Sequence, residues 1–232
     1  MQPQDLLHFT ICGSVNEGKS TLIGRLLRES QPMFDDPMAG REQGMTIDVA
    51  YRFFVSTRRK YIVANTPCDE QYTRNMVTGT STADVAVLLV DARQGLFTQT
   101  RRHAYLASLM GIHNVVLAVN KMDLVGFDAA TFSCISDAFE QFAKPLSFKS
   151  ISAVPVSALR GDNITQRSAN TPWYAGPTLM GYLETVQVKP ESVDHQHQAP
   201  CGSQHPGFRS RHAAHTQRHL CLQTGQQQAP GI

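Results

Sequence analysis

The sequence lacks a strong excess of either positive or negative charge. Its 232 residues carry 21 Lys and Arg against 19 Asp and Glu, which leaves a formal net charge of +2. Such a balance gives no electrostatic reason to bind nucleic acid or a membrane surface. No stretch approaches the roughly 20 apolar residues of a membrane span, and residues 1–5 lack the basic and apolar regions of a secretory signal. We therefore expect no nucleic-acid partner and no membrane association.

Cysteine is also sparse, and its positions follow no metal-ligand spacing. The chain has five cysteines, scattered from Cys12 to Cys221. An odd number of scattered cysteines indicates free thiols in a reducing compartment rather than a disulfide framework. We therefore predict a cytoplasmic protein.

A glycine-rich segment fits the phosphate-binding loop pattern at every required position. Residues 13–20 read Gly-Ser-Val-Asn-Glu-Gly-Lys-Ser and stand between a strand-like run, 6–12, and a helix-like run, 19–29. Glycines at 13 and 18 let backbone N–H groups turn toward a polyphosphate, and Lys19 adds a positive charge. The Ser20 hydroxyl is placed to ligate Mg²⁺. The pattern alone also occurs in ATPases or by chance, so a second signal is needed.

That second signal is Asn120-Lys121-Met122-Asp123, which follows another apolar run, 114–119. A buried strand ending here presents Asn120 and Asp123 to the edge of a base, and Asp123 can accept from the two N–H groups of guanine. Taken alone, the tetrapeptide could be a surface turn, but both segments follow strands in the expected order. Ser157-Ala158-Leu159 ends a further apolar run and adds weaker support, through a backbone N–H that can meet the base oxygen. The sequence therefore predicts a GTP and GDP site.

Short apolar strands alternate with helical patterns from Leu6 to Val188, which predicts an α/β fold. The expected architecture is that of a P-loop GTPase (G domain): a mixed, mostly parallel six-stranded sheet with helices on both faces. The turn between 47–55 and 60–64 is too short for a parallel connection, so that pair must be antiparallel. We expect strands near 6–12, 47–55, 60–64, 85–90, 114–119 and 150–156, and helices near 19–29, 70–80, 98–110, 129–143 and 177–186.

The pattern ends near Pro190. Residues 191–232 hold six of the nine histidines, eight glutamines and no lysine. Without apolar periodicity, such a segment cannot bury enough surface to offset its ordering entropy. Metal binding by the histidines is the alternative, but their spacing is irregular. We predict a GTP-binding domain over 1–190 and a disordered His- and Gln-rich tail over 191–232.

Residues 6–190 resemble the GTPase (large) subunit of bacterial sulfate adenylyltransferase and the related nodulation-type bifunctional proteins, which are relatives of the translation-factor GTPases. The resemblance rests on several stretches: 12–27, Arg-Glu-Gln-Gly-Met-Thr-Ile-Asp-Val-Ala-Tyr-Arg at 41–52, 70–76, 91–95, 99–103 and Pro-Trp-Tyr-Ala-Gly-Pro-Thr-Leu at 172–179. It implies a smaller catalytic subunit as partner, which joins sulfate to ATP, with GTP hydrolysis driving that step. Family members continue into β-barrel domains that this sequence lacks, which puts docking of that partner in question.

The resemblance also assigns residues to roles. Mg²⁺ would be held by Ser20, Thr46 and Asn65, and the catalytic residues would be Lys19, Thr46 and Asp69. Nucleotide would contact Gly13, Ser14, Val15, Asn16, Glu17, Gly18, Lys19, Ser20, Thr21, Asn65, Thr66, Pro67, Cys68, Asp69, Asn120, Lys121, Met122, Asp123, Ser157, Ala158 and Leu159.

The third motif departs from the family pattern. Where the family has Asp-Thr-Pro-Gly-His, this sequence has Asn65-Thr66-Pro67-Cys68-Asp69. Asn65 loses the negative charge that supports Mg²⁺, and Cys68 adds a Cβ that restricts the backbone. Asp69 places a carboxylate near an anionic phosphate, although it could alternatively act as a general base. We predict impaired hydrolysis, which leaves two function classes: a GTP-hydrolysing subunit, or a guanine-nucleotide-binding module from a truncated relative.

The segment between the first helix and Arg41 is a second departure. The family carries a long switch segment there, whereas only Glu29 to Gly40 remain in this sequence. Thr46 keeps its place for offering oxygen to Mg²⁺ and the γ-phosphate. Asn16 replaces an Asp that is common among relatives, and its neutral side chain need not change the loop.

Overall fold

The computed structural model describes residues 5–32, 50–65, 80 and 82–188. The chain divides into two units, Met1–Lys189 and Pro190–Ile232, and the description below concerns the first. Several predictions lie outside the described residues: the helix at 70–80 except for Thr80, the Mg²⁺ ligand Thr46, residues 66–69, and the disordered tail at 191–232.

A seven-stranded sheet forms the centre of the first unit, in the order β2-β3-β4-β1-β5-β6-β7. β1 pairs in parallel with β4 and β5, and the parallel arrangement continues through β6 to β7. β3 pairs antiparallel with both β4 and β2, so the sheet is mixed as the short 56–59 turn requires. The strands are β1 (Leu6–Cys12), β2 (Gln31–Pro32), β3 (Ala50–Val55), β4 (Lys60–Asn65), β5 (Val85–Asp91), β6 (Asn114–Asn120) and β7 (Ser150–Pro155).

All six predicted strands are present, and β2 is a seventh that the sequence did not indicate. It has two residues and pairs only with the end of β3. A segment that short has no room for an alternating pattern, so no periodicity could reveal it.

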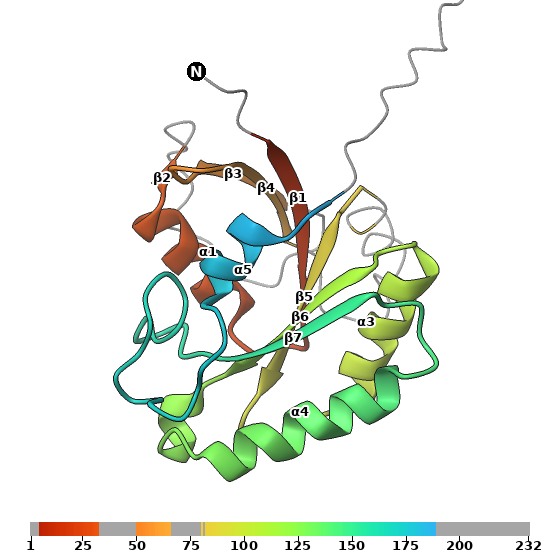
Figure 1. Cartoon of the computed structure of the whole chain (residues 1–232), viewed down its shortest axis with the longest axis vertical. Helices are drawn as coiled ribbons and strands as arrows, with labels where there is room; N and C mark the ends of the chain where they lie inside the picture. The colour runs from red at the N-terminus through yellow and green to blue at the C-terminus, as the bar shows by residue number, and fades with distance from the viewer. Residues whose placement is uncertain (1–4, 33–49, 66–79, 81, 189–232) are drawn as a thin grey trace, which may run out of the picture. The chain divides into compact units, whose positions relative to one another are not determined.

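Helices cover both faces of the sheet (Figure 1). α1 (Lys19–Glu29) and α5 (Leu179–Thr185) pack into the hydrophobic cluster on one face, and α3 (Thr98–Leu109) and α4 (Ala129–Ala143) pack into the cluster on the other. A 3-10 helix, η2 (Met122–Val125), follows β6. None of the described helices has the length and hydropathy to cross a bilayer.

The central strand β5 contributes residues to the hydrophobic cluster on each face of the sheet. Every residue from Val85 to Asp91 is buried. Val85, Val87 and Leu89 belong to the cluster beneath α1 and α5, while the residues between them belong to the cluster beneath α3 and α4. This double burial explains why the strand reads as a continuous apolar run rather than an alternation. The parallel pairing of β1, β5 and β6 places their carboxyl ends at one edge of the sheet, where ligands bind in open α/β sheets.

Candidate guanine-nucleotide site

The phosphate loop connects the end of β1 to the first turn of α1, as its sequence predicts. Two of its residues have left-handed backbone conformations, Asn16 with φ 67° and Gly18 with φ 96°. A Cβ added at Gly18 would lie 2.5 Å from Asn120 Nδ2. Glycine is therefore required at position 18 both for its backbone conformation and for the close approach of the base-recognition strand.

Lys19 lies within the loop rather than pointing into solvent. Its ammonium donates to the carbonyl oxygens of Gly13, at 2.6 Å, and Ser14, at 3.1 Å. The side chain is 7% exposed. These bonds hold a positive charge inside the turn, where it can meet a polyphosphate. Ser20 and Thr21 are exposed on the first turn of α1, where the helix N-terminus favours anions.

A buried carboxyl group also belongs to the loop. Glu17 is 2% exposed, one of its oxygens accepts from the Ser14 backbone N–H, and Oε1 has no hydrogen-bond partner among the described residues. Burial raises the pKa of Glu17 to about 7, although the Ser14 hydrogen bond and the charge of Lys19 act in the opposite direction. The Ser14 N–H of the phosphate loop is therefore engaged by a side-chain oxygen in this structure.

Asn120 joins the phosphate loop to the base-recognition loops. Its Nδ2 donates to the Glu17 carbonyl at 2.7 Å, and its Oδ1 accepts from the Ala158 N–H at 2.9 Å. One buried amide thus fixes three segments that are far apart in the sequence. The Ala158 N–H, which belongs to the 157–159 segment predicted to offer a backbone N–H to the base oxygen, is engaged with Asn120 in this structure.

Asp123, the residue predicted to select guanine, lies on η2 and is half-buried. No hydrogen bond joins its carboxylate to another described residue. The neighbouring Met122 is buried, and its N–H donates to the Val156 carbonyl at 3.2 Å. From α1, Arg25 donates to the carbonyls of Ala158 and Leu159 and so supports the second base loop. The structure therefore brings the two predicted base-recognition segments together.

A charge cluster that the sequence did not indicate lies beside these segments. Asp91, at the end of β5, is 2% exposed and accepts from Arg93 and Lys121, each at 2.7 Å. Burial alone would raise the pKa of Asp91, but the hydrogen bonds from Arg93 and Lys121 outweigh it and hold that pKa below its usual range. Lys121, which has φ 64°, also donates to the Asn16 carbonyl at 2.5 Å. The lysine of the Asn-Lys-Met-Asp segment thus binds the phosphate loop.

Asn65, the predicted Mg²⁺ residue of the third motif, is placed as expected at the carboxyl end of β4. It is buried and pairs in register with Ile11 of β1, two residues before the phosphate loop. Of the predicted site residues, Thr46, Thr66, Pro67, Cys68 and Asp69 lie outside the described part of the chain. The oxygen of Asn65 and the Ser20 hydroxyl are donors of the kind that Mg²⁺ prefers.

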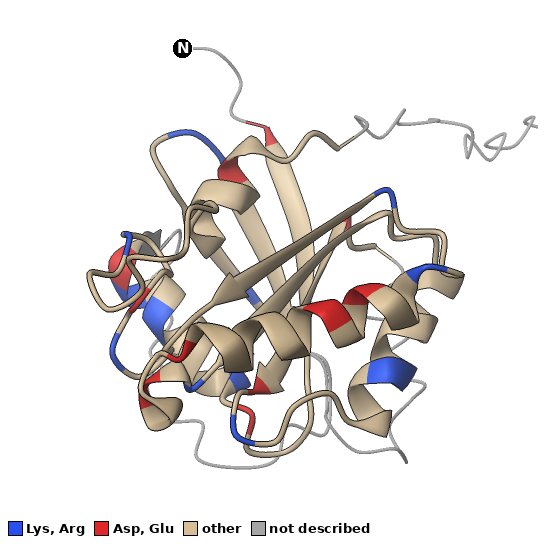
Figure 2. Cartoon of the chain, turned by 60° about the horizontal axis from the view of Figure 1, so that its bottom comes forward, with Lys and Arg blue, Asp and Glu red and all other residues tan. Residues whose placement is uncertain are grey.

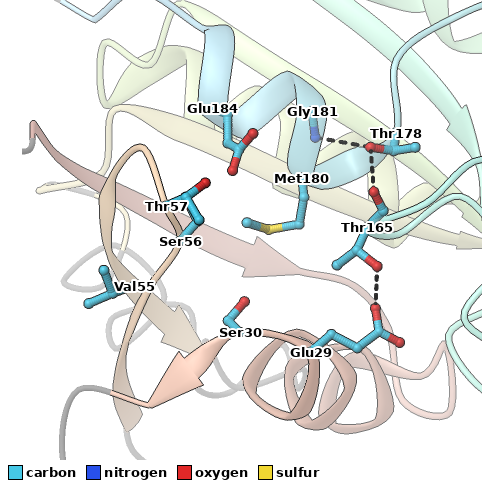
Figure 3. Close-up of a pocket in the computed structure, with 10 residues that line it drawn as sticks. All are labelled: Glu29, Ser30, Val55, Ser56, Thr57, Thr165, Thr178, Met180, Gly181 and Glu184. Carbon is cyan, nitrogen blue, oxygen red and sulfur yellow. Dashed lines mark hydrogen bonds between the residues drawn. The ribbon is translucent and has the colours of Figure 1, made fainter.

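The structure also contains a cavity of about 510 Å³ away from this site (Figure 3). It lies at the C-terminal end of α1, whereas the phosphate loop lies at the N-terminal end. The close-up shows Thr165 donating to Glu29, at 2.5 Å, and the Gly181 N–H donating to Thr178, at 3.0 Å. Its polar groups are therefore partly satisfied within the protein. The lining residues are Glu29, Ser30, Val55, Ser56, Thr57, Thr165, Thr178, Met180, Gly181 and Glu184.

Comparison with solved structures supports the fold. The bacterial selenocysteine-specific elongation factor EF-Sec aligns with a TM-score of 0.56 at 24% identity, over 68% of this chain and 26% of that chain. Elongation factor SelB from Methanococcus maripaludis, solved with the GTP analogue GppNHp, aligns with a TM-score of 0.57 at 20% identity, over 68% of this chain and 31% of that chain. At these identities the likeness concerns the fold alone.

Comparison with curated proteins gives much higher identities. Sulfate adenylyltransferase subunit 1 from Methylorubrum populi is 52% identical over 217 residues, which cover 82% of this chain and 46% of the relative. The bifunctional enzyme NodQ from Rhizobium sp. (strain N33) is 50% identical over 220 residues, which cover 83% of this chain and 34% of the relative. The chain therefore spans about a third to a half of the length of these relatives.

The family comparison covers the domain described above. Residues 4–187 match the elongation factor Tu GTP-binding domain, a range that contains every described element of the sheet and its helices. The phosphate loop, the Asn120 bridge and Asp123 all lie within it. This chain belongs to the family of the elongation factor Tu GTP-binding domain.

Proposed function

We propose that this chain is the GTP-binding regulatory subunit of a sulfate adenylyltransferase, which couples GTP hydrolysis to the formation of adenylyl sulfate from ATP and sulfate. The observation that carries the guanine-nucleotide part is the Asn120 bridge, because it holds the phosphate loop and both base loops in one arrangement. The sulfate part rests on the relatives that are 46–52% identical and are named sulfate adenylyltransferase subunit 1. The five cysteines favour a cytoplasmic location.

Each part of the site has a separate task in this proposal. The loop N–H groups and Lys19 bind the polyphosphate, since N–H groups at a helix start and a nearby cation stabilise phosphate charge. Asp123 accepts from the N–H groups of guanine, and a buried polar site of this kind rejects a base that leaves it unpaired. Ser20, Asn65 and Thr46 would hold Mg²⁺, whose charge neutralises the phosphate oxygens.

Binding and sulfate chemistry need separate tests. Titration of the nucleotide-free chain with GDP and ADP tests the guanine site, and we expect GDP to bind at least a hundredfold more tightly. Equal affinity for the two would overturn the guanine assignment. Because the chain covers less than half of its relatives, docking of the smaller catalytic subunit is tested by co-purification and by GTP-dependent release of pyrophosphate from ATP and sulfate.

We further propose that hydrolysis is impaired, which favours a binding module as the second candidate function. The observation behind it is the sequence Asn65-Thr66-Pro67-Cys68-Asp69, which alters metal support, backbone freedom and water positioning together. The triple variant Asn65→Asp, Cys68→Gly, Asp69→His should raise the single-turnover rate at least roughly tenfold, equivalent to about 1.4 kcal/mol of barrier.

The single reversions serve as controls for this triple variant. Each should raise the rate less than the three together, because groups that act as a unit are not additive. The preference for GDP over ADP should stay unchanged in all four variants, since the base loops are untouched. A native chain that already hydrolyses GTP as fast as the triple variant would show that Asp69 is a competent substitute.

A further inference from the structure

The 3-10 helix that carries Asp123 is followed by Phe127, whose backbone conformation must be stabilised by contacts with other segments. Phe127 has φ 56°, which is uncommon for a residue with a bulky side chain. Its N–H donates to the Met122 carbonyl at 2.8 Å and so closes the turn around Asp123. A residue held in this region is strained, and it persists only where its surroundings fix it.

Trp173 supplies one such support. Its indole Nε1–H donates to the Phe127 carbonyl at 3.0 Å. The indole is 36% exposed, and its ring contacts Phe132 of α4 with the centroids 5.4 Å apart. The hydrogen bond therefore links the 172–177 segment to the residue that closes the Asp123 turn.

The Phe127 side chain makes a second link, to the other base loop. Its ring is 9% exposed, and the Arg160 guanidinium lies over it, 5.7 Å from the centroid. Arg160 directly follows the Ser157–Leu159 segment. Phe127 thus connects the two base loops: its carbonyl is held by Trp173, its N–H closes the Asp123 turn, and its ring is covered by a residue of the second loop.

We propose that Trp173 is a positioning residue for guanine recognition, which acts by holding Phe127 and thereby the turn that carries Asp123. The inference rests on the guanine site proposed above. A carboxylate recognises the two N–H groups of guanine only at hydrogen-bond distance from both. A turn that is free to relax at Phe127 would hold Asp123 less firmly at that edge of the base.

The test uses Trp173→Phe in the full chain, because phenylalanine keeps an aromatic ring against Phe132 and removes the N–H donor. Tyr174→Phe is the matched control: it removes one hydroxyl from the adjacent residue, whose Oη donates to the carbonyls of Pro177, at 2.9 Å, and Ala153, at 3.0 Å, and not to Phe127. Both variants are titrated with GDP and with inosine diphosphate, which lacks the exocyclic amino group that Asp123 would bind. A melting temperature without nucleotide is measured for each.

We expect Trp173→Phe to weaken GDP binding about fivefold and inosine diphosphate binding less than twofold, a loss of the size that one hydrogen bond produces. Tyr174→Phe should leave the ratio of the two affinities at its native value. A ratio that stays native in Trp173→Phe, even with a lower melting temperature, would reduce Trp173 to a structural role and overturn the inference.

If Trp173→Phe does not fold, Arg160→Gln tests the role of Phe127 at an exposed residue instead. It removes the guanidinium from the Phe127 ring, and the ratio of GDP to inosine diphosphate affinity should fall about twofold. An unchanged ratio would overturn the connection. If the native chain itself binds GDP and inosine diphosphate equally while still preferring both to ADP, the role of Asp123 fails and this inference fails with it. Absence of any nucleotide binding would instead refute the proposed function.

Discussion

Glu17 is a buried acid in a loop built to bind anions. Because burial raises its pKa from 4.5 to about 7, the folded state holds the proton more tightly than the unfolded state does. The stabilisation that results is fully present below pH 4.5 and is lost as the pH rises through 7. The nucleotide-free domain should therefore be less stable in alkaline than in acidic buffer, as far as this residue is concerned.

Glu17→Gln isolates that contribution, because the amide keeps the shape of the side chain and cannot ionise. Relative to this variant, the native free energy of unfolding should fall by about 2 kcal/mol between pH 5.5 and pH 8. Urea denaturation at the two pH values, without nucleotide, measures it. Glu140→Gln, at an exposed position on α4, is the control. Parallel pH profiles for native and Glu17→Gln protein would contradict the raised pKa.

Base selectivity is also set by a single residue. Asp123→Asn replaces an acceptor by an amide that can donate, so guanine loses its partner and xanthine, which has an oxygen at that position, gains one. We expect GDP affinity to fall at least tenfold and xanthosine diphosphate to become the preferred ligand. Competition between the two diphosphates for the variant measures the outcome. Retained preference for GDP would mean that another group reads this edge of the base.

Residues whose position in the fold follows from a local motif were predictable, whereas contacts between distant segments were not. Gly18, Lys19 and Asn120 belong to fixed spacings, and the structure places each at the loop or strand that the spacing indicates. Asp91 and Trp173 have no such signature. Their partners Lys121 and Phe127 lie 30 and 46 residues away in the sequence, so only the folded chain brings them together.

At the scale of elements, the ends of β5 and β6 are tied to each other and to the phosphate loop. Asp91 ends β5 and accepts from Lys121, which follows β6, and Lys121 also donates to Asn16 of the loop. The Ala92 N–H donates to the Asn120 carbonyl at 2.9 Å. Parallel pairing brings the motifs to one edge of the sheet. At that edge, an ion pair and a backbone hydrogen bond also link the ends of β5 and β6.

Asp91→Asn tests this cross-link. The amide keeps the shape but removes the charge that faces Arg93 and Lys121. Because both cations are partly exposed, the expected loss of stability is about 1–2 kcal/mol at neutral pH rather than the larger value of a fully buried pair. Urea denaturation at pH 7 measures it, with Asp137→Asn on the exposed face of α4 as control. Equal stability of native and Asp91→Asn protein would show that the cluster contributes nothing net.

The predicted helices and strands agree best with the structure where the apolar pattern extends over several residues. The predicted bounds 6–12, 19–29 and 129–143 coincide with β1, α1 and α4, and β5 and β6 each extend one residue further than predicted. The 3-10 helix η2 was missed because its four residues fall within a motif that carries no helical period. It is stabilised by the hydrogen bond from the Met122 N–H to the Val156 carbonyl and by the one from the Phe127 N–H to the Met122 carbonyl. A local sequence pattern predicts neither bond.

At the scale of the whole molecule, charges of both signs lie on helices and loops of the described part, and the α4 ribbon carries acidic residues (Figure 2). The chain covers 34% of the NodQ relative and 46% of the sulfate adenylyltransferase relative. Alignment with NodQ runs over 220 positions but covers only 83% of this chain, so the relative contains residues within the aligned range that this chain lacks. Under the proposed function, nucleotide binding uses the phosphate loop and the two base-recognition segments, which all lie within the range that matches the family.

Residues 190–232 should therefore be dispensable for nucleotide binding. Among the described residues, the hydrophobic clusters that enclose the sheet extend as far as Val188. Ending the chain after Lys189 should leave the melting temperature within about 2 °C and the GDP affinity within about twofold of the native values, because a segment without apolar periodicity contributes little to a hydrophobic core. Ending it after Thr178 is the control: it removes Leu179 and Leu183, which are fully buried, and should abolish cooperative unfolding. Weaker GDP binding after removal of 190–232 alone would show that this segment contributes to the site.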